Sequence, residues 1–218
     1  RMLRYYAVIF DLDGTLLDTE RLVIDAGLTT LQGMGHPVAR DFMVNLVGVD
    51  DREGHRRLCA HLGVELDRQS FASEWSTTAQ RAYAGGIPLM QGVTALLDHI
   101  AGRGLPRAVA TNSHTESARQ KLSKAGIAHH FDPDHIVGFD AVPNPKPAPD
   151  VFLTAAARLG ADPAGCVAFE DSDTGVAAAL AAGMTVVQIP DMRPAGNRDA
   201  HHLAETILDG ARACGLID

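Results

Sequence analysis

The sequence has few cysteines, few aromatic residues and no long apolar run. Its three cysteines, Cys59, Cys166 and Cys214, form an odd and scattered set, which disfavours a disulfide framework and is typical of reduced thiols. The longest uncharged stretch, from Gly175 to Ile189, is shorter than the roughly 20 residues that cross a bilayer. Residues 1–6 lack the apolar core of a signal peptide. We therefore expect a soluble, cytoplasmic protein with no membrane partner.

Basic charge is also scarce. The 218 residues include 27 acidic and 19 basic side chains, which gives a formal net charge of -8. No run of lysine or arginine is present to follow a phosphate backbone, so nucleic acid is not an expected partner. Apolar residues make up 46% of the chain and charged residues 21%, which is ordinary globular usage. A small molecule is the expected partner, and a monomer is the default.

Four short apolar runs predict strands that are buried on both faces, because such runs without polar alternation are typical of parallel sheets. They cover residues 6–10, 107–111, 166–169 and 185–189. Helical patterns cover residues 93–101, 117–124, 149–159 and 175–182. Strands that alternate with helices predict an α/β fold with a doubly wound parallel sheet, in which ligands bind at the C-terminal ends of the strands.

The segment between residues 19 and 86 has a different character. Its pattern is helical, without convincing strands, and it ends at Gly85-Gly86-Ile87-Pro88, where glycine and proline mark a break. We therefore expect two domains. Residues 1–18 and 87–218 form the core, and residues 19–86 form an inserted all-helical domain.

Two carboxylates follow the first predicted strand. Asp11 and Asp13 are separated by one residue, and Gly14 after them permits a sharp turn. Carboxylates this close repel each other unless a cation or a proton offsets their charge, and a divalent ion is the natural solution. The plainer interpretation is a helix N-cap beside a solvated acid, and Asp-x-Asp alone favours it. The other strand ends decide between the two.

Hydroxyl and amide groups follow the second strand. Thr111 and Asn112 stand where side-chain and backbone donors can hold a phosphate oxygen. The alternative is that this segment only caps the following helix, a role that we expect of Ser113 or Thr115.

A lysine and two acids complete the set. Lys146 lies between two prolines, which restrict the backbone and favour a placed cation over a solvated one. Glu170 and Asp171 follow the third strand, although an ordinary acidic loop is the plainer interpretation of that pair alone.

The order of these four segments, each at a strand end, carries a family resemblance. They read Asp11-Leu-Asp-Gly-Thr15, Thr111, Lys146 and Glu170-Asp171. In this order they resemble the four motifs of the haloacid dehalogenase-like hydrolases, and the resemblance spans almost the whole chain. The insertion resembles the helical cap of the branch that contains sugar-phosphate phosphatases and β-phosphoglucomutases.

The resemblance implies a cofactor and a mechanism. Asp11 would attack phosphorus, and Asp13 would protonate the leaving oxygen and then activate the water that cleaves the aspartyl-phosphate. Mg²⁺ would be held by Asp11, the main-chain carbonyl of Asp13 and Asp171, with Glu170 as a direct or water-mediated partner. These roles suit phosphoryl transfer, in which positioning and charge stabilisation dominate.

The resemblance also implies a phosphate site and a substrate class. Thr111 and Lys146 would bind phosphoryl oxygens, and Asn112 belongs to the same expected site. The substrate would be a small phosphate monoester built on a sugar or a nucleoside-like scaffold. Within the insertion, the segment from Gly48 to Arg52 resembles a cap loop in which a basic residue, here Arg52, contacts the distal part of the substrate.

Two departures from related patterns narrow the activity. Dehalogenases of this superfamily lack the second acid of the first motif, whereas Asp13 is present here. Mutases carry a histidine in the early cap where this sequence has Val23. Both departures favour a phosphatase over dehalogenation and over β-phosphoglucomutase-like phosphoryl transfer.

Two further functions remain open at this level. A glycosyltransferase also uses Asp-x-Asp to bind a metal and a nucleotide sugar, but it leaves Lys146 and the Glu170-Asp171 pair without roles. A phosphoaspartate binding or signalling module would accept phosphate and retain it. Asp13 argues against that module, because a positioned acid/base beside the phosphoaspartate should shorten its lifetime.

Overall fold

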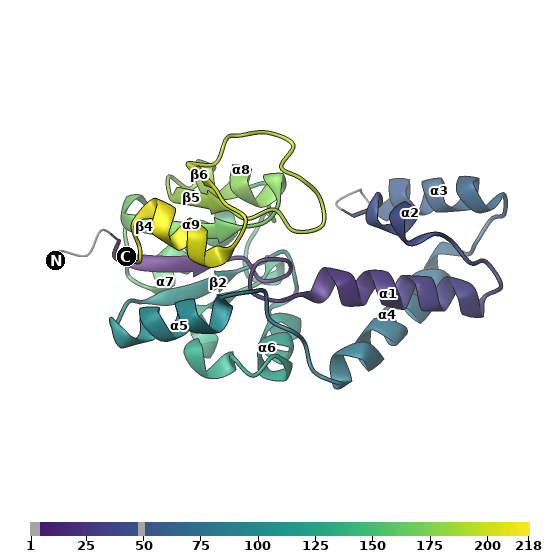
Figure 1. Ribbon diagram of the computed structural model, residues 1–218, viewed down its shortest axis with the longest axis horizontal. Helices are drawn as coiled ribbons and strands as arrows, with labels where there is room; N and C mark the ends of the chain where they lie inside the picture. Colours follow the sequence, from purple (N-terminus) through teal and green to yellow (C-terminus); the bar gives the residue numbers. More distant parts are fainter. Residues whose placement is uncertain (1–4, 48–50) are drawn as a thin grey trace. The chain divides into compact units, whose positions relative to one another are not determined.

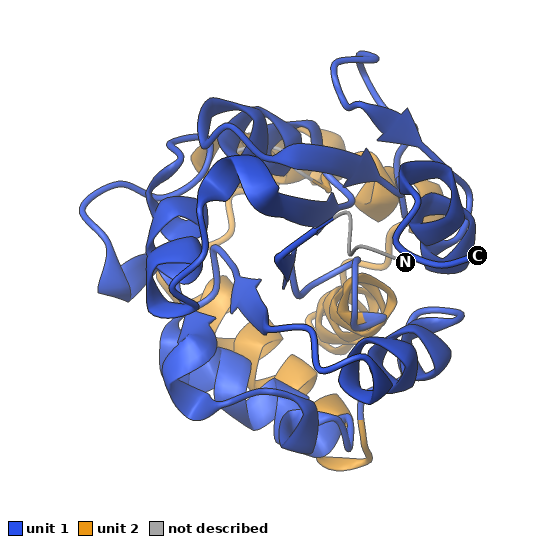
Figure 2. Ribbon diagram, turned by 90° about the vertical axis from the view of Figure 1, so that its left-hand side faces the viewer, with its two compact units in different colours: residues 1–18, 87–218 blue, residues 19–86 orange. Residues whose placement is uncertain are grey.

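The computed structural model describes residues 5–47 and 51–218 of the chain. The chain separates into two compact units, one formed by Arg1–Asp18 with Ile87–Asp218 and the other by Thr19–Gly86 (Figure 2). Within the described ranges, every helix is too short or too polar to cross a membrane. We call Arg1–Asp18 with Ile87–Asp218 the core unit and Thr19–Gly86 the insertion unit.

A parallel sheet of six strands forms the centre of the core unit (Figure 1). Its order is β3-β2-β1-β4-β5-β6, so β1 lies between β2 and β4, and Val8 pairs with Arg107 on one side and Val167 on the other. The strand order reverses between β1 and β4, and the crevice at such a reversal is where α/β sheets bind ligands. The strands are β1 (Ala7–Phe10), β2 (Arg107–Ala110), β3 (Ile136–Val137), β4 (Cys166–Glu170), β5 (Thr185–Gln188) and β6 (His202–Leu203).

Helices cover both faces of this sheet, which confirms the predicted α/β fold. Helices α7 and α8 pack on one face, and α5 and α9 contact each other on the opposite face (Figure 2). The helices are α5 (Val93–Gly102), α6 (Thr115–Lys124), α7 (Asp150–Arg158), α8 (Asp173–Ala181) and α9 (Ile207–Cys214). Short 3-10 turns are η1 (Ala128–His130), η2 (Pro133–His135), η3 (Phe139–Ala141) and η4 (Pro163–Gly165).

Small side chains let α7 and α8 approach the sheet closely. The cluster that they form with the sheet is buried and rich in alanine, including Ala155 and Ala156 of α7 and Ala178 and Ala179 of α8, which are completely buried. Close packing of this kind keeps the ends of the strands in fixed positions. A rigid frame therefore carries the side chains that follow β1, β2 and β4.

The insertion unit is helical throughout its described elements. They are α1 (Thr19–Gly33), α2 (Arg40–Val44), α3 (Asp51–Leu62) and α4 (Arg68–Ala84), and α1 packs along α4 (Figure 1). Trp75 of α4 donates its indole N–H to the carbonyl of Val23 on α1 at 2.7 Å. A Cβ on Gly27 would lie 2.8 Å from the Trp75 ring, so the absence of a side chain there permits the close approach of the two helices.

The core segments on either side of the insertion are joined to each other. Leu17 and Leu89 form an antiparallel bridge. The amide of Asp18 donates to the carbonyl of Pro88 at 2.9 Å, and the amide of Met90 donates to the carbonyl of Leu16 at 3.0 Å. The chain therefore leaves the core unit and returns to it at neighbouring points.

Candidate active site

The turn after β1 positions the first predicted site residue. The amide of Asp11 donates to the carbonyl of Phe169 on β4 at 2.9 Å, and the Asp11 side chain is buried. Gly14 has a φ of 86°, and a Cβ there would lie 2.5 Å from Asp171 Oδ2. Glycine thus satisfies two requirements at once, because it adopts the left-handed backbone and leaves space for the Asp171 carboxylate.

A buried ion-pair cluster lies at the C-terminal ends of β1 and β4. Lys146 Nζ donates to Asp11 Oδ1 at 2.7 Å and to Glu170 Oε1 at 2.5 Å. The exposed fractions of the three side chains are only 4%, 10% and 1%, in the order Lys146, Asp11 and Glu170. The Thr15 hydroxyl donates to the second oxygen of Asp11 at 3.2 Å. Each of these buried charges requires a partner of opposite sign, because an unpaired charge that is buried away from water destabilises the fold.

The titration of this cluster reflects its burial. Burial raises the pKa of Asp11 from its ordinary 3.8 to about 7, and the Glu170 carboxylate adds to the rise, while Lys146 opposes it. Burial alone lowers the pKa of Lys146, but Asp11 and Glu170 outweigh that effect and hold the pKa above its ordinary range. One ammonium therefore faces two carboxylates, so a further positive charge is needed to balance both when they are ionised.

Asn112 fixes the main chain of Lys146. Its side-chain carbonyl accepts from the Lys146 amide at 2.9 Å, and its NH₂ donates to the Lys146 carbonyl at 3.2 Å. The Asn112 side chain is thus a clamp on the lysine, although we expected it among the phosphate ligands. Thr111 is buried beside it, and its hydroxyl oxygen accepts from the Ser113 amide at 3.0 Å. A hydroxyl that accepts this bond still has its hydrogen to donate to an anion.

Glu170 is held by the start of α8. Its second oxygen accepts from the Ser172 amide at 3.3 Å and from the Ser172 hydroxyl at 3.1 Å. Ser172 is the N-cap of α8 and accepts from the Gly175 amide at 3.1 Å. A Cβ on Gly175 would lie 1.9 Å from the Glu170 carboxylate, so this position of Glu170 depends on glycine.

Three carboxylates of the candidate site can hold a metal ion. Oxygen atoms of Asp11, Glu170 and Asp171 lie within 4.8 Å of one another. Carboxylate oxygens are the ligands that Mg²⁺ prefers. Burial is the main cause of the raised pKa of Asp11, and a cation here would offset the repulsion from Glu170 that adds to it. The donor set therefore fits a hard divalent cation.

Asp13 points toward α6 and contacts two residues that the sequence analysis did not assign to the site. Lys121 Nζ lies 2.7 Å from Oδ1 and 2.8 Å from Oδ2, and the Ser113 hydroxyl donates to Oδ2 at 2.7 Å. The expectation that Ser113 or Thr115 caps α6 is wrong. His114 is the N-cap, and its ring accepts from the Glu116 amide at 3.3 Å.

Arg52 belongs to the insertion unit and not to the compact cluster just described. It lies in the first turn of α3 and is exposed. Gly48, Val49 and Asp50, which complete its predicted cap loop, lie outside the described residues. Its contact with substrate stays a prediction.

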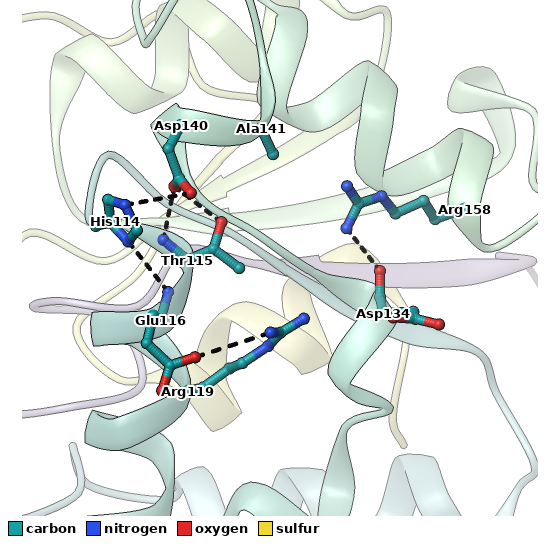
Figure 3. Close-up of a pocket in the computed structure, with 8 residues that line it drawn as sticks. All are labelled: His114, Thr115, Glu116, Arg119, Asp134, Asp140, Ala141 and Arg158. Carbon is teal, nitrogen blue, oxygen red and sulfur yellow. Dashed lines mark hydrogen bonds and ion pairs between the residues drawn. The ribbon is translucent and has the colours of Figure 1, made fainter.

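A separate hollow lies beside α6 on the core unit (Figure 3). Its volume is about 570 Å³, and polar side chains from α6, η2, η3 and α7 line it. Asp140 Oδ1 accepts from the Thr115 amide at 2.7 Å and faces the His114 ring through its other oxygen at 3.5 Å. Arg119 pairs with Glu116 at 3.8 Å. The described residues that line this hollow are different from those of the candidate site.

The fold and the site define a class of protein: a parallel α/β enzyme with acids and a buried lysine gathered where the strand order reverses. Residues 8–189 match the family model described as haloacid dehalogenase-like hydrolase. The chain belongs to this family.

Two relatives illustrate its place in the family. It is 32% identical over 178 residues to a phosphorylated carbohydrates phosphatase of Thermotoga maritima, a match that covers 82% of each chain. It is 34% identical over 186 residues to the fructose-1-phosphate phosphatase of Escherichia coli, covering 85% of this chain and 97% of the relative.

Solved structures resemble the chain along nearly its whole length. A haloacid dehalogenase family hydrolase of Deinococcus radiodurans, solved with bound phosphate and sodium, superposes with a TM-score of 0.83 at 25% identity, covering 98% of this chain and 96% of that one. The CbbY protein of Rhodobacter sphaeroides, in a complex with xylulose-(1,5)bisphosphate, superposes with a TM-score of 0.74 at 26% identity, covering 93% and 94%.

Proposed function

We propose that this protein is a phosphatase that hydrolyses small phosphate monoesters, sugar phosphates above all, through an aspartyl-phosphate on Asp11. The observation that carries the proposal is the buried contact of Asp11 with Lys146 beside Glu170 and Asp171. A carboxylate can approach a phosphate dianion only where cations offset the repulsion, and this site gathers one cation and ligands for another. The relatives named for sugar-phosphate hydrolysis support the substrate class.

The residues of the candidate site have different parts in the proposed reaction. An Asp11 oxygen bonds to phosphorus while the bond to the leaving oxygen breaks, and Asp13 gives its proton to that oxygen. Lys146 and the Thr111 hydroxyl stabilise the phosphoryl oxygens. Asp13 then takes a proton from water, whose oxygen bonds to phosphorus as the bond to Asp11 breaks. Inorganic phosphate and free Asp11 result.

Asp11, Asp171 and the Asp13 carbonyl would hold Mg²⁺, with Glu170 beside them. When bound, the ion supplies positive charge that offsets the negative charge of the carboxylates and of the phosphoryl group. We propose that the insertion unit and its Arg52 select the substrate, because the insertion resembles the helical cap of related phosphatases.

A first test measures phosphate release from a panel of sugar phosphates and phenyl phosphate with and without Mg²⁺. We expect turnover with Mg²⁺ and its loss after exhaustive chelation, restored when Mg²⁺ is added back. Turnover that survives chelation would contradict the metal requirement, and no phosphate release from any ester would contradict the phosphatase activity.

β-Glucose 1-phosphate with a bisphosphate activator distinguishes a phosphatase from a mutase. Because Val23 stands where mutases carry histidine, we expect inorganic phosphate and little glucose 6-phosphate.

A second prediction concerns pH. The pKa of Asp11 in the folded chain, about 7, lies above its ordinary 3.8, so the folded chain keeps a proton that the unfolded chain releases. The stability of the metal-free protein therefore falls as pH rises from about 4 to about 7. Mg²⁺ requires the ionised carboxylate, so its affinity should weaken by up to about tenfold for each unit of pH below about 7.

Calorimetric titration with Mg²⁺ in buffers of different ionisation enthalpy measures both the affinity and the proton released. Asp11→Asn provides the control, since it cannot release this proton. An Mg²⁺ affinity of the wild-type protein that stays constant across this pH range would contradict the prediction.

A further inference from the structure

A three-membered polar cluster surrounds the carboxylate of Asp13. Lys121 contacts both of its oxygens, at 2.7 Å and 2.8 Å, and the Ser113 hydroxyl donates to one of them at 2.7 Å. Lys121 and Ser113 also contact each other at 3.0 Å, which closes the ring of contacts. The three residues come from the turn after β1, the loop after β2 and the middle of α6. Asp13 is 100 residues from Ser113 and 108 residues from Lys121 in the sequence, yet all three belong to the core unit.

The burial of this cluster distinguishes it from an ordinary surface ion pair. The exposed fraction is 12% for the Lys121 side chain and 28% for Asp13. By contrast, Arg56 and Glu53 on α3 form a pair whose exposed fractions are 69% and 35%. Exposed pairs of the second kind contribute little, because water screens the charges and both side chains lose freedom. The long lysine side chain is instead largely withdrawn from water and is held by its contacts with Asp13 and Ser113.

The geometry leaves Asp13 able to react. A carboxylate oxygen accepts about two hydrogen bonds, so Oδ1, which Lys121 contacts and Ser113 does not, can still carry the transferred proton. Together, Lys121 and Ser113 limit the orientations that the short Asp13 side chain can adopt. Loss of the donors would leave the acid present but no longer held in one place.

We propose that Lys121, together with Ser113, is a positioning residue that fixes the Asp13 carboxylate for proton transfer to the leaving group. The inference rests on the proposed phosphatase function. Asp13 gives its proton to the leaving oxygen as the phosphorus–oxygen bond breaks, and it later takes a proton from the attacking water. Lys121 remains an ammonium throughout and exchanges no proton.

Leaving-group dependence tests the proposal. Phenyl phosphate needs protonation of its leaving oxygen more than dinitrophenyl phosphate does, since dinitrophenolate is already a stable anion. In Lys121→Met we expect kcat/KM for phenyl phosphate, which reports formation of the aspartyl-phosphate and not its hydrolysis, to fall about 10- to 100-fold, the scale of a misplaced catalytic group. For dinitrophenyl phosphate we expect a loss of no more than about threefold. Lys121→Arg should restore most of the rate, because it also donates to a carboxylate.

Two controls separate positioning from other effects. Lys124→Met makes the same change at an exposed site on the same helix, and it should leave both rates unchanged. In an Asp13→Asn background, Lys121→Met should have no further effect, because a residue that acts through Asp13 has nothing left to position. If Lys121→Met does not fold, Ser113→Ala takes its place and should show the same leaving-group pattern at a few-fold scale.

The outcomes that overturn the inference are distinct from failure of the proposed function. Equal losses of kcat/KM for both esters, or an effect on kcat/KM that persists with Asp13→Asn, would make Lys121 a substrate ligand or a structural residue. Rates equal to wild type for both esters in Lys121→Met or, where that variant does not fold, in Ser113→Ala would remove its role. The proposed function fails separately, if the wild-type protein hydrolyses neither ester or if Asp11→Asn hydrolyses them as fast.

Discussion

Asp11→Asn should reduce phosphate release by about 10⁴-fold or more, the scale of losing a nucleophile. The amide has nearly the same shape as the carboxylate, but it is a poor nucleophile and carries no charge to attract a divalent cation. Phosphate release with excess Mg²⁺ measures the loss, and circular dichroism reports whether the fold persists. The fold should persist, because the main-chain N–H of residue 11 keeps its hydrogen bond to the Phe169 carbonyl and Lys146 keeps Glu170 as a partner.

A matched control supports this measurement. Asp98→Asn makes the same chemical change on α5, where the carboxylate is 66% exposed. It should keep wild-type turnover. Turnover near the wild-type rate in Asp11→Asn would require a different nucleophile and would refute the aspartyl-phosphate.

Lys146→Met should damage both stability and activity. Removing one partner from a buried ion pair typically costs about 3–5 kcal/mol, because the remaining charge has lost its compensation. Here two carboxylates, Asp11 and Glu170, lose their shared ammonium. Urea unfolding in chelator measures the cost, and Mg²⁺ should recover part of it, since the ion supplies replacement charge. The rate should also fall by about 10²- to 10³-fold with Mg²⁺ present, as expected on losing one preorganised donor.

Lys124→Met again provides the control, because it removes a lysine that is exposed on α6. If Lys146→Met were as stable as wild type in chelator, the buried acids would be neutral and the ion-pair description would be wrong. If only stability changed and turnover stayed at the wild-type rate, Lys146 would be structural and not a phosphate ligand.

Sequence patterns predicted the longer elements of the sheet well and the shortest ones not at all. The runs that form β1, β2, β4 and β5 are four or five residues long, and each has apolar residues at its centre. Strands β3 and β6 have two residues each, which is too few to show any periodicity. Their places depend on pairing with β2 and β5, which is a tertiary effect.

The candidate site divides in the same way. Order along the chain and position at strand ends indicated Asp11, Glu170 and Asp171, and the flanking prolines indicated Lys146. The structure brings these four side chains into one cluster. Their chemical roles stay predictions. Nothing local to Lys121 could have marked it, because a lysine in a polar helix looks the same whether it faces water or Asp13.

Asn112 shows a related limit. A polar residue at a strand end indicates a ligand or a cap with equal force, since both uses need the same hydrogen-bonding groups. Its two bonds to the Lys146 main chain join positions 34 residues apart. Only the folded chain reveals that contact.

The joined segments at the base of the insertion have a consequence for how this chain can change. Hydrogen bonds join Leu16–Asp18 to Pro88–Met90, so the core's own contacts hold together the two points between which the insertion is placed. A replacement of residues 19–86 by another helical segment of different length would attach to the same pair of anchors. The substrate recognition that we propose for the insertion would then be exchanged as a module, while the pairing of the Asp11 amide with Phe169 of β4 is kept.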